Sequence, residues 1–206
     1  MKLVKFVTSD HIILLKEIKS LMFIFENLSA QKEKLLECIS SKNANDIIGK
    51  IRLISNEVYS GCEIINQLLI GIYREDDRYR GTQLRRGFND NFKGVYNASL
   101  NNEQEKREIY KDEFIHSFFS GAKTWFVDLH DIRTQETHYE VGRIEEIDDE
   151  LYYINGNRNG TSKYIYSNPS NETKIKLSKF IVLIERFLNV ENDITEFLIS
   201  RTDLTE

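Results

Sequence analysis

The chain has 206 residues, of which 40% are hydrophobic and 30% charged, a balance typical of a globular protein with one sizeable core. Its formal net charge of −5 argues against general binding of nucleic acid, because such binding depends on cations that meet phosphates. One proline and ten glycines leave few obligatory breaks, which favours long helices over a sheet. The composition therefore predicts a single, mainly α-helical domain spanning residues 1–206.

The first residues predict neither a signal peptide nor a membrane span. The longest early apolar run, Ile12 to Leu15, ends at Lys16 and is too short for either. Cys38 and Cys62 show no CxxC or Cys/His ligand spacing, so we expect them to be reduced thiols in the core. The protein is therefore expected to be soluble and cytoplasmic, with no metal or cofactor.

Apolar residues recur at helical spacing in the first half of the chain. A first helix is predicted from about Ser9 to Ser40, with a break near Ser29. A second helix is predicted from Ala44 to about Tyr73, with Asn43 as its cap. The passage from Arg74 to Ala98 contains three glycines and five arginines, and it predicts a surface loop with one short helix.

The second half begins with an aromatic helix. Asn101 or Asn102 is expected to cap it, and its apolar seam continues through Trp125 to Ile132. Two short aromatic and β-branched runs then flank Asn-Gly pairs, which predicts a small β-hairpin near residues 150–166.

Two more helices are predicted after the hairpin. Asn168 and Pro169 form the expected start of one, while Asp193 and Glu196 make a capping box for the last. We find no internal repeat or linker, so these helices are expected to share one core. The predicted fold is a bundle of about five or six helices with a small hairpin insertion.

A polar stretch, LHDIRTQETHYEV, follows directly on the aromatic seam. In an unbroken helix the side chains of Arg133 and His138 would diverge by roughly 140°, because successive residues turn by about 100°. They converge only if the helix ends between them or if a second copy of the chain supplies one of them. Gly142 is a natural stop, so the helix is expected to close near Glu136.

The stretch FVDLHDIRTQETHYEV resembles the signature of the HEPN superfamily, helical-bundle proteins marked by an arginine, four to six residues and a histidine. Arg133 and His138 match this pattern with four residues between them. The aromatic helix before the motif and Tyr139 after the histidine are also similar to the family. The resemblance implies metal-independent cleavage of RNA, in which the ribose 2′-hydroxyl attacks the neighbouring phosphate. In the family the site is usually shared by two copies of the chain.

The resemblance also implies a role for each residue of the motif. Histidine has a reference pKa of about 6.5, which suits His138 to proton transfer at neutral pH. Arg133 would hold the phosphate, and Thr134 would add a hydroxyl contact. Thr134 departs from the family, which commonly has Asn, Asp or His directly after the arginine. This departure keeps a second interpretation open, in which a catalytically inactive helical bundle binds a protein or nucleotide partner.

Other residues match the mixture of charge and stacking that binds single-stranded RNA. They are Arg78, Arg80, Arg85 and Arg86 in the passage after Tyr73, together with His130 and Tyr139 beside the motif. Acidic neighbours cancel much of this charge, so an ordinary polar loop is the competing interpretation. The resemblance further implies a homodimer, a bacterial toxin or defence role, and an antitoxin or other protein partner.

Overall fold

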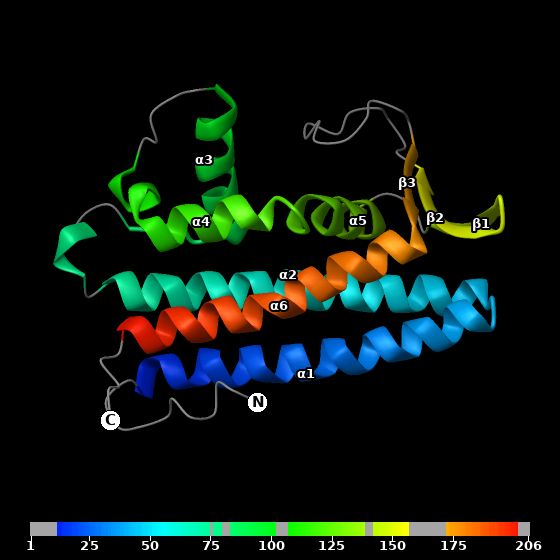
Figure 1. Ribbon diagram of the computed structural model, residues 1–206, viewed down its shortest axis with the longest axis horizontal. Coiled ribbons are helices and arrows are strands. Elements are labelled where there is room, and N and C mark those ends of the chain that lie inside the picture. The colour runs from blue at the N-terminus through cyan, green and yellow to red at the C-terminus, as the bar shows by residue number, and fades with distance from the viewer. Residues whose placement is uncertain are drawn as a thin grey trace. The chain divides into compact units, whose positions relative to one another are not determined.

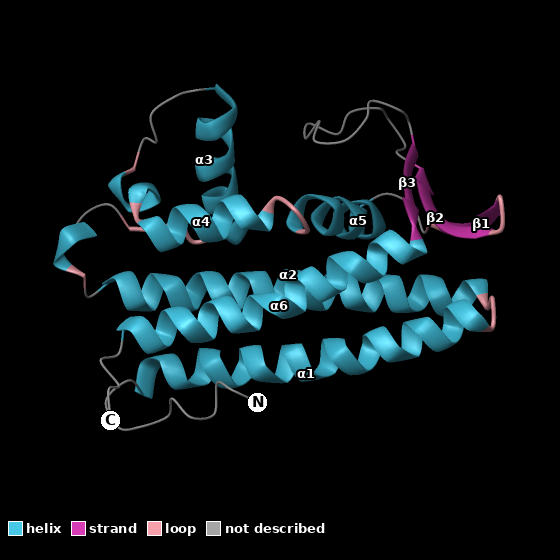
Figure 2. Cartoon of the chain, in the orientation of Figure 1, coloured by secondary structure: helices cyan, strands magenta, loops and turns pink. Residues whose placement is uncertain are grey.

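The structure is a computed structural model, and it describes residues 12–74, 76–79, 83–101, 107–138, 142–156 and 172–201. Within these ranges, the side chains of residues 12–14, 97–101, 135–138, 155–156, 172–173 and 201 are not described. The described residues form six α-helices and one three-stranded antiparallel sheet (Figures 1 and 2). The predicted fold, a mainly helical bundle with a small β insertion, is confirmed.

The elements follow the chain in a simple order. The helices are α1 (Ile12–Ser40), α2 (Ala44–Arg74), α3 (Phe88–Asn101), α4 (Glu113–Ala122), α5 (Phe126–His138) and α6 (Leu177–Arg201), with short 3₁₀ helices η2 (Asp77–Tyr79) and η3 (Glu108–Lys111). The strands are β1 (Arg143–Ile147), β2 (Glu150–Gly156) and β3 (Glu172–Lys176). The chain divides into two compact units: unit 1 is Met1–Phe25, Ser60–Lys123 and Asn189–Glu206, and unit 2 is Glu26–Tyr59 and Thr124–Leu188.

Helices α1 and α2 confirm the first two predicted helices. α1 continues through Ser29 without the expected break, because Leu28 and Leu35 keep their places on its buried face. α2 begins after Asn43, whose side-chain oxygen accepts a hydrogen bond from the backbone N–H of Asp46 at 3.4 Å.

Helix α3, in unit 1, is longer than the sequence predicted. Most of the passage from Arg74 to Ala98 was expected to be a loop, but α3 begins at Phe88. The side chains of Phe88 and Phe92 are buried, and the Phe88 ring centre lies 5.1 Å from that of Phe119 in α4. These aromatic contacts stabilise a helix that its polar sequence alone does not indicate.

Helix α4, in unit 1, begins later than predicted. Asn101 is the last residue of α3, and the cap of α4 is Asp112, which is buried. Its carboxylate accepts two backbone hydrogen bonds from the first turn of α4, at 3.1 and 3.2 Å. It also accepts hydrogen bonds from the hydroxyls of Tyr73, at 2.5 Å, and Tyr79, at 3.0 Å. Four donors thus fix this carboxylate at the start of α4.

The sheet of unit 2 has the strand order β1-β2-β3, with Ile144, Tyr153 and Ile175 paired across it. The turn between β1 and β2 consists of Asp148 and Asp149, whose φ angles are 54° and 62°. These left-handed values suit the tight turn of a hairpin. The Asn-Gly pairs on which the hairpin prediction rested begin only at Asn155, near the end of β2, and residues 157–171 lie outside the described residues.

A small hairpin was predicted near residues 150–166. β2 covers its first part, and residues 157–166 lie outside the described residues. Gly142 stands immediately before β1, where an added Cβ atom would overlap the ring of Tyr153. The close approach of that buried ring therefore requires glycine.

A single helix, α6, replaces the last two predicted helices. It begins at Leu177 directly after β3, whereas Asn168 and Pro169 lie outside the described residues. It passes Asp193 without a break, so the predicted capping box with Glu196 does not form. Its buried residues keep helical spacing throughout: Phe180, Leu183, Ile184, Phe187, Val190, Ile194, Phe197 and Leu198.

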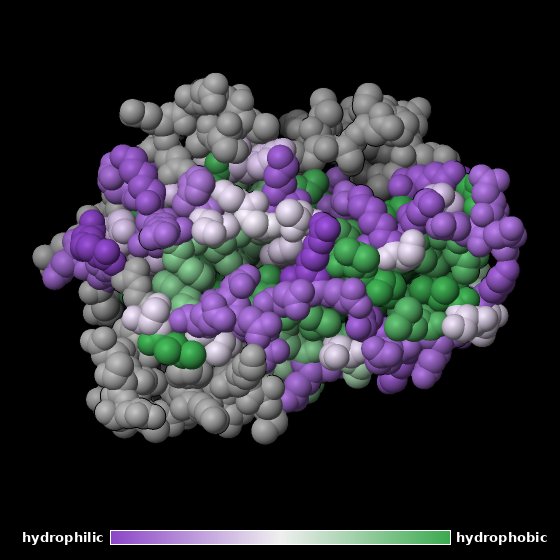
Figure 3. All heavy atoms as spheres, viewed as in Figure 1, coloured by the Kyte–Doolittle hydropathy of each residue, from purple (hydrophilic) through white to green (hydrophobic). Residues whose placement is uncertain are grey.

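Large apolar side chains are exposed at scattered positions of three helices. They are Phe23 and Leu36 in α1, Leu53 in α2, and Val182 and Ile199 in α6. Figure 3 shows apolar and hydrophilic side chains interspersed on one face. Among the described residues, no helix has both the length and the apolar character of a membrane span.

Candidate functional site

The candidate site lies on α5, in unit 2. The single helix predicted through this region is interrupted by a turn at residues 123–125, and α5 begins at Phe126. Phe126, Leu129 and Ile132 are buried and hold one face of α5 against the apolar interior. Their placement fixes the directions of the polar residues between and after them.

Arg133 and His130 both contact a tyrosine from another helix. The guanidinium carbon of Arg133 lies 4.2 Å from the centre of the Tyr59 ring in α2. The His130 ring centre lies 6.1 Å from that of Tyr59 and 5.2 Å from that of Phe126. Residues three apart on a helix lie on the same face, which explains the shared contact. We call Tyr59, Phe126, His130 and Arg133 the Tyr59 cluster.

The polar groups of the Tyr59 cluster are only partly open to solvent. The side chains of His130 and Asp131 are 14% and 15% exposed, and His130 Nδ1 lies 3.9 Å from Asp131 Oδ1. Arg133 and Thr134 are half-buried. Partial removal of water strengthens the attraction between the guanidinium and an anion that reaches it.

The hydrogen bond of Glu57 helps to hold α2 beside α1 within unit 2. The Asn27 amide in α1 donates to the Glu57 carboxylate, two residues before Tyr59. Burial raises the pKa of Glu57, and this hydrogen bond partly offsets the rise. The interhelical contact therefore supports the part of α2 that carries Tyr59.

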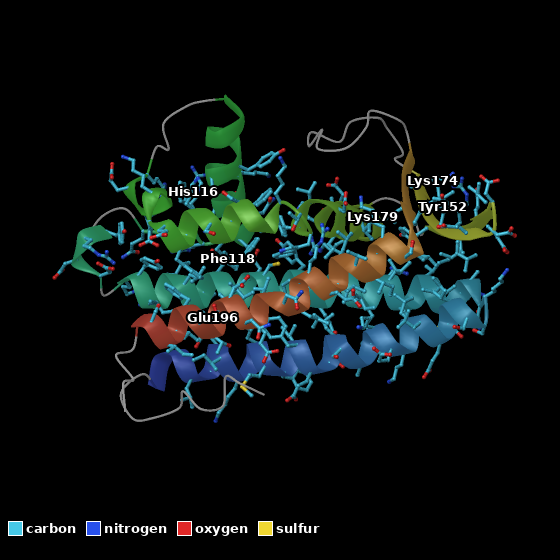
Figure 4. The ribbon with its side chains drawn as sticks, in the orientation of Figure 1. His116, Phe118, Tyr152, Lys174, Lys179 and Glu196 are labelled. Atoms are coloured by element: carbon cyan, nitrogen blue, oxygen red, sulfur yellow. The ribbon has the colours of Figure 1, made fainter. Side chains whose placement is uncertain are left out.

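The lysines near the sheet of unit 2 are engaged within that unit. Lys179 in the first turn of α6 donates to the carboxylate of Asp128 in α5 at 2.7 Å. The ammonium of Lys174 lies 4.6 Å from the centre of the Tyr152 ring, and Figure 4 shows both side chains on the sheet. These cations are thus committed to contacts other than the Tyr59 cluster.

The backbone of α5 places the two predicted catalytic residues at separate positions around the helix. α5 remains helical through His138, two residues beyond the end expected near Glu136. Because the helix is unbroken, positions 133 and 138 lie about 140° apart around its axis. The side chain of His138 and the whole of Tyr139 lie outside the described residues. The histidine that shares a face with Arg133 is His130.

Three of the four arginines predicted to contact RNA lie in the described part of unit 1, and their surroundings differ. Arg78 is paired with Asp76, with 2.6 Å between Nη2 and Oδ2. Arg80 lies outside the described residues. Arg85 and Arg86 are exposed, and buried amide groups hold their backbone, as described below. The sequence alone did not distinguish the ion-paired Arg78 from Arg85 and Arg86.

Sequence reasoning missed Tyr59. It lies beside Val58 on the flank of the apolar seam of α2, far along the chain from the motif. Nothing in its local sequence distinguishes it from an ordinary seam aromatic. Only the packing of α5 on α2 within unit 2 reveals its contact with Arg133.

In the described ranges, no group of three or more His, Cys, Asp and Glu side chains is arranged to hold a metal ion. No family model matches the chain, and no match is found among curated proteins or solved structures. The function must therefore be argued from the geometry of the site.

Proposed function

We propose that the protein is a HEPN-like, metal-independent endoribonuclease. The observation that carries this proposal is the placement of Arg133, half-buried against the Tyr59 ring and beside His130. A guanidinium presents paired N–H donors that match two oxygens of a phosphate. The Tyr59 cluster therefore supplies a pre-positioned cation for a phosphodiester.

The proposed reaction is an internal attack on that phosphodiester. The ribose 2′-oxygen forms a bond to phosphorus and loses its proton to a base, while the bond to the 5′-oxygen breaks and that oxygen gains a proton. The products are a 2′,3′-cyclic phosphate and a 5′-hydroxyl end. Arg133 stabilises the negative charge that develops on the phosphate oxygens, and Thr134 adds a hydroxyl contact.

Proton transfer is assigned to His138 of a second copy of the chain. The unbroken helix α5 supports this choice, because it places positions 133 and 138 about 140° apart around its axis. A homodimer would pair Arg133 of each copy with His138 of the other. Neutral imidazole and imidazolium are both available near pH 7, as the two proton transfers require.

The biological setting is part of the same proposal and follows from the resemblance of the motif. It is a cytoplasmic protein of a bacterial toxin or defence system, restrained by an antitoxin or another protein partner. The residues singled out for RNA contact in unit 2 are His130 and Tyr139.

The decisive experiment measures cleavage of mixed RNA in EDTA. We expect the wild type to produce 5′-hydroxyl ends, and Arg133→Ala and His138→Ala each to lower the rate by about 100-fold or more. Arg74→Ala, which removes an exposed arginine of unit 1, serves as the matched control. Equal rates in all four proteins, or cleavage that EDTA abolishes, would overturn the proposal.

A second candidate function is a catalytically inactive bundle that binds a protein or nucleotide partner. Two observations favour it: positions 133 and 138 lie on different sides of the unbroken α5, and Thr134 departs from the family pattern. This candidate predicts no RNA cleavage by the wild type and a partner whose binding weakens in Arg133→Ala.

A further inference from the structure

Two buried amides fix a short surface loop, residues 83–87, in unit 1. Asn66 of α2 and Asn91 of α3 are fully buried, and Asn91 Nδ2 donates to Asn66 Oδ1 at 2.7 Å. Asn66 Nδ2 lies 3.0 Å from the carbonyl oxygen of Arg85 and 2.8 Å from that of Arg86. The Asn91 amide accepts from the Arg85 N–H and donates to its carbonyl, both at 2.8 Å.

Further hydrogen bonds complete this network. The Tyr110 hydroxyl donates to Asn91 Oδ1 at 3.0 Å, and Arg107 donates to the carbonyl of Gln83 at 2.7 Å. Buried amides are costly to leave unpaired, and both of these are satisfied largely by the backbone of the loop. The network therefore holds that backbone in one conformation.

The side chains that this loop presents are two exposed arginines. Among the described residues, neither Arg85 nor Arg86 takes part in an ion pair. Glu63, which approaches the end of the loop, accepts a hydrogen bond from the Phe88 N–H at 3.3 Å. Arg78 differs, because Asp76 neutralises it. The loop thus offers two adjacent guanidinium groups that no acidic side chain in the described part of the chain neutralises, on a fixed backbone.

We propose that the loop of residues 83–87 binds the phosphate backbone of single-stranded RNA, with Arg85 and Arg86 each contacting a phosphate. RNA is the favoured partner because the guanidinium fork matches a phosphate. The choice also rests on the proposed function, which supplies RNA as the substrate. A fixed backbone lowers the entropy lost when the arginines bind.

The test measures binding separately from cleavage. The probe is a fluorescent 2′-O-methyl oligonucleotide, which lacks the attacking hydroxyl, and its anisotropy is followed at several KCl concentrations. We expect the double variant Arg85→Ala/Arg86→Ala to bind about 10- to 30-fold more weakly at 0.1 M salt. The slope of log K against log salt should become shallower by about 1.4, or about 0.7 for each phosphate that an arginine no longer neutralises.

Three variants test whether RNA binding depends on the position and shape of the two loop arginines and not only on their positive charge. Arg74→Ala/Arg186→Ala removes two exposed arginines elsewhere and should leave the slope unchanged. Arg85→Lys/Arg86→Lys should keep the slope and lose part of the affinity, because lysine lacks the fork. Gln67→Ala removes an exposed donor to the Arg86 carbonyl, at 3.2 Å, and should weaken binding by about 2- to 3-fold because one hydrogen bond to the loop is removed.

The outcomes distinguish this proposal from the ribonuclease. Wild-type binding in the Arg85→Ala/Arg86→Ala variant would overturn the loop site and leave RNA cleavage by the Tyr59 cluster untouched. Loop-dependent binding by a protein that does not cut RNA would support the loop site and overturn the ribonuclease. Tighter loop-dependent binding of a fluorescent poly-glutamate peptide than of RNA would also overturn the loop site, and would assign it to an acidic protein.

Discussion

The guanidinium of Arg133 lies on the ring of Tyr59, with 4.2 Å between the guanidinium carbon and the ring centre. Tyr59 belongs to α2 and Arg133 to α5, so a helix outside the motif restrains the motif arginine. A cation–π contact of this kind contributes about 0.5–2 kcal/mol. The arginine is therefore held in place without the proposed phosphate ligand.

Removal of the Tyr59 ring should weaken the proposed catalysis. We expect Tyr59→Ala to lower kcat/KM for RNA cleavage by about 2- to 30-fold, the equivalent of that contact energy. Tyr59→Phe keeps the ring and should stay close to the wild type. Circular dichroism would show whether both variants fold. If Tyr59→Phe were as impaired as Tyr59→Ala, the hydroxyl and not the ring would be the essential group.

Mixing two inactive variants should restore activity if the site is shared between copies. Arg133→Ala and His138→Ala subunits, mixed equally, would give about half heterodimers, each with one intact site. We therefore expect about a quarter of the wild-type rate, measured after exchange of subunits. Each variant alone, treated in the same way, is the control. A mixture as inactive as its components would place both residues of a working site in one chain.

The hydrogen bond between Tyr79 and Asp112 should make stability depend on pH in the alkaline range. The pKa of Tyr79 is raised above its ordinary value of 10.0, first by burial and then by this hydrogen bond. The folded state therefore holds the phenol proton more tightly than the unfolded chain. The resulting stability is present in full below pH 10 and is lost as the pH rises through the raised pKa.

Urea unfolding of the wild type and Tyr79→Phe between pH 7 and about 11 would measure this effect. The variant cannot titrate at this position, so its deficit in unfolding free energy should be constant up to about pH 9 and shrink above pH 10. A deficit that stayed constant to the end of the range would show that the phenol proton is not linked to folding.

The contact between Gly94 and Tyr110 should make residue 94 intolerant of a side chain. An added Cβ atom would lie 2.5 Å from the buried Tyr110 ring, whose hydroxyl also donates to the Asn66–Asn91 network. We expect Gly94→Ala to lower the unfolding free energy by about 1–3 kcal/mol.

Gly49→Ala is the matched control, because it also lies in a helix but has nothing within 4 Å of an added Cβ atom. It should raise stability by about 0.5–1 kcal/mol. Urea denaturation compares the two variants. Equal effects of the two substitutions would mean that helix propensity, and not the Tyr110 contact, governs residue 94.

The sequence predicts the fold best where helical periodicity is long and uninterrupted. Ile47, Ile51, Ile54 and Val58 repeat at this spacing, and they lie buried in α2 as expected. Prediction is poorer where tertiary contacts override local signals. Phe88 and Phe92 stand in a polar sequence, yet they anchor α3 through contacts made elsewhere in unit 1.

The turn of the sheet illustrates a different difficulty. Asn-Gly is the strongest local signal for a tight hairpin turn, and the chain offers it after residue 154. The turn between β1 and β2 uses Asp148 and Asp149, and the three strands are in register with Ile144, Tyr153 and Ile175 side by side across the sheet. Aspartate tolerates a left-handed backbone, so the strand register can place the turn at Asp148 and Asp149.

The candidate site was predictable only in part. The motif marked Arg133, but a local pattern contains no information on Tyr59, which reaches the arginine from another helix. In the same way, sequence reasoning treated four arginines as equivalent. The structure distinguishes them. Asp76 neutralises Arg78, whereas Asn66 holds the backbone of Arg85 and Arg86.

Gly142 bears on how a genetic screen of this protein would be interpreted. Any larger residue there collides with the Tyr153 ring, at the entry to the strand that follows the motif. Random mutagenesis scored by loss of the proposed toxicity should then recover codon 142 together with codon 133, although glycine has no reactive group. Melting temperatures would distinguish the two kinds of variant. Proteins substituted at residue 142 should unfold at a lower temperature than the wild type, whereas proteins substituted at Arg133, the proposed active-site arginine, should unfold near the wild-type temperature.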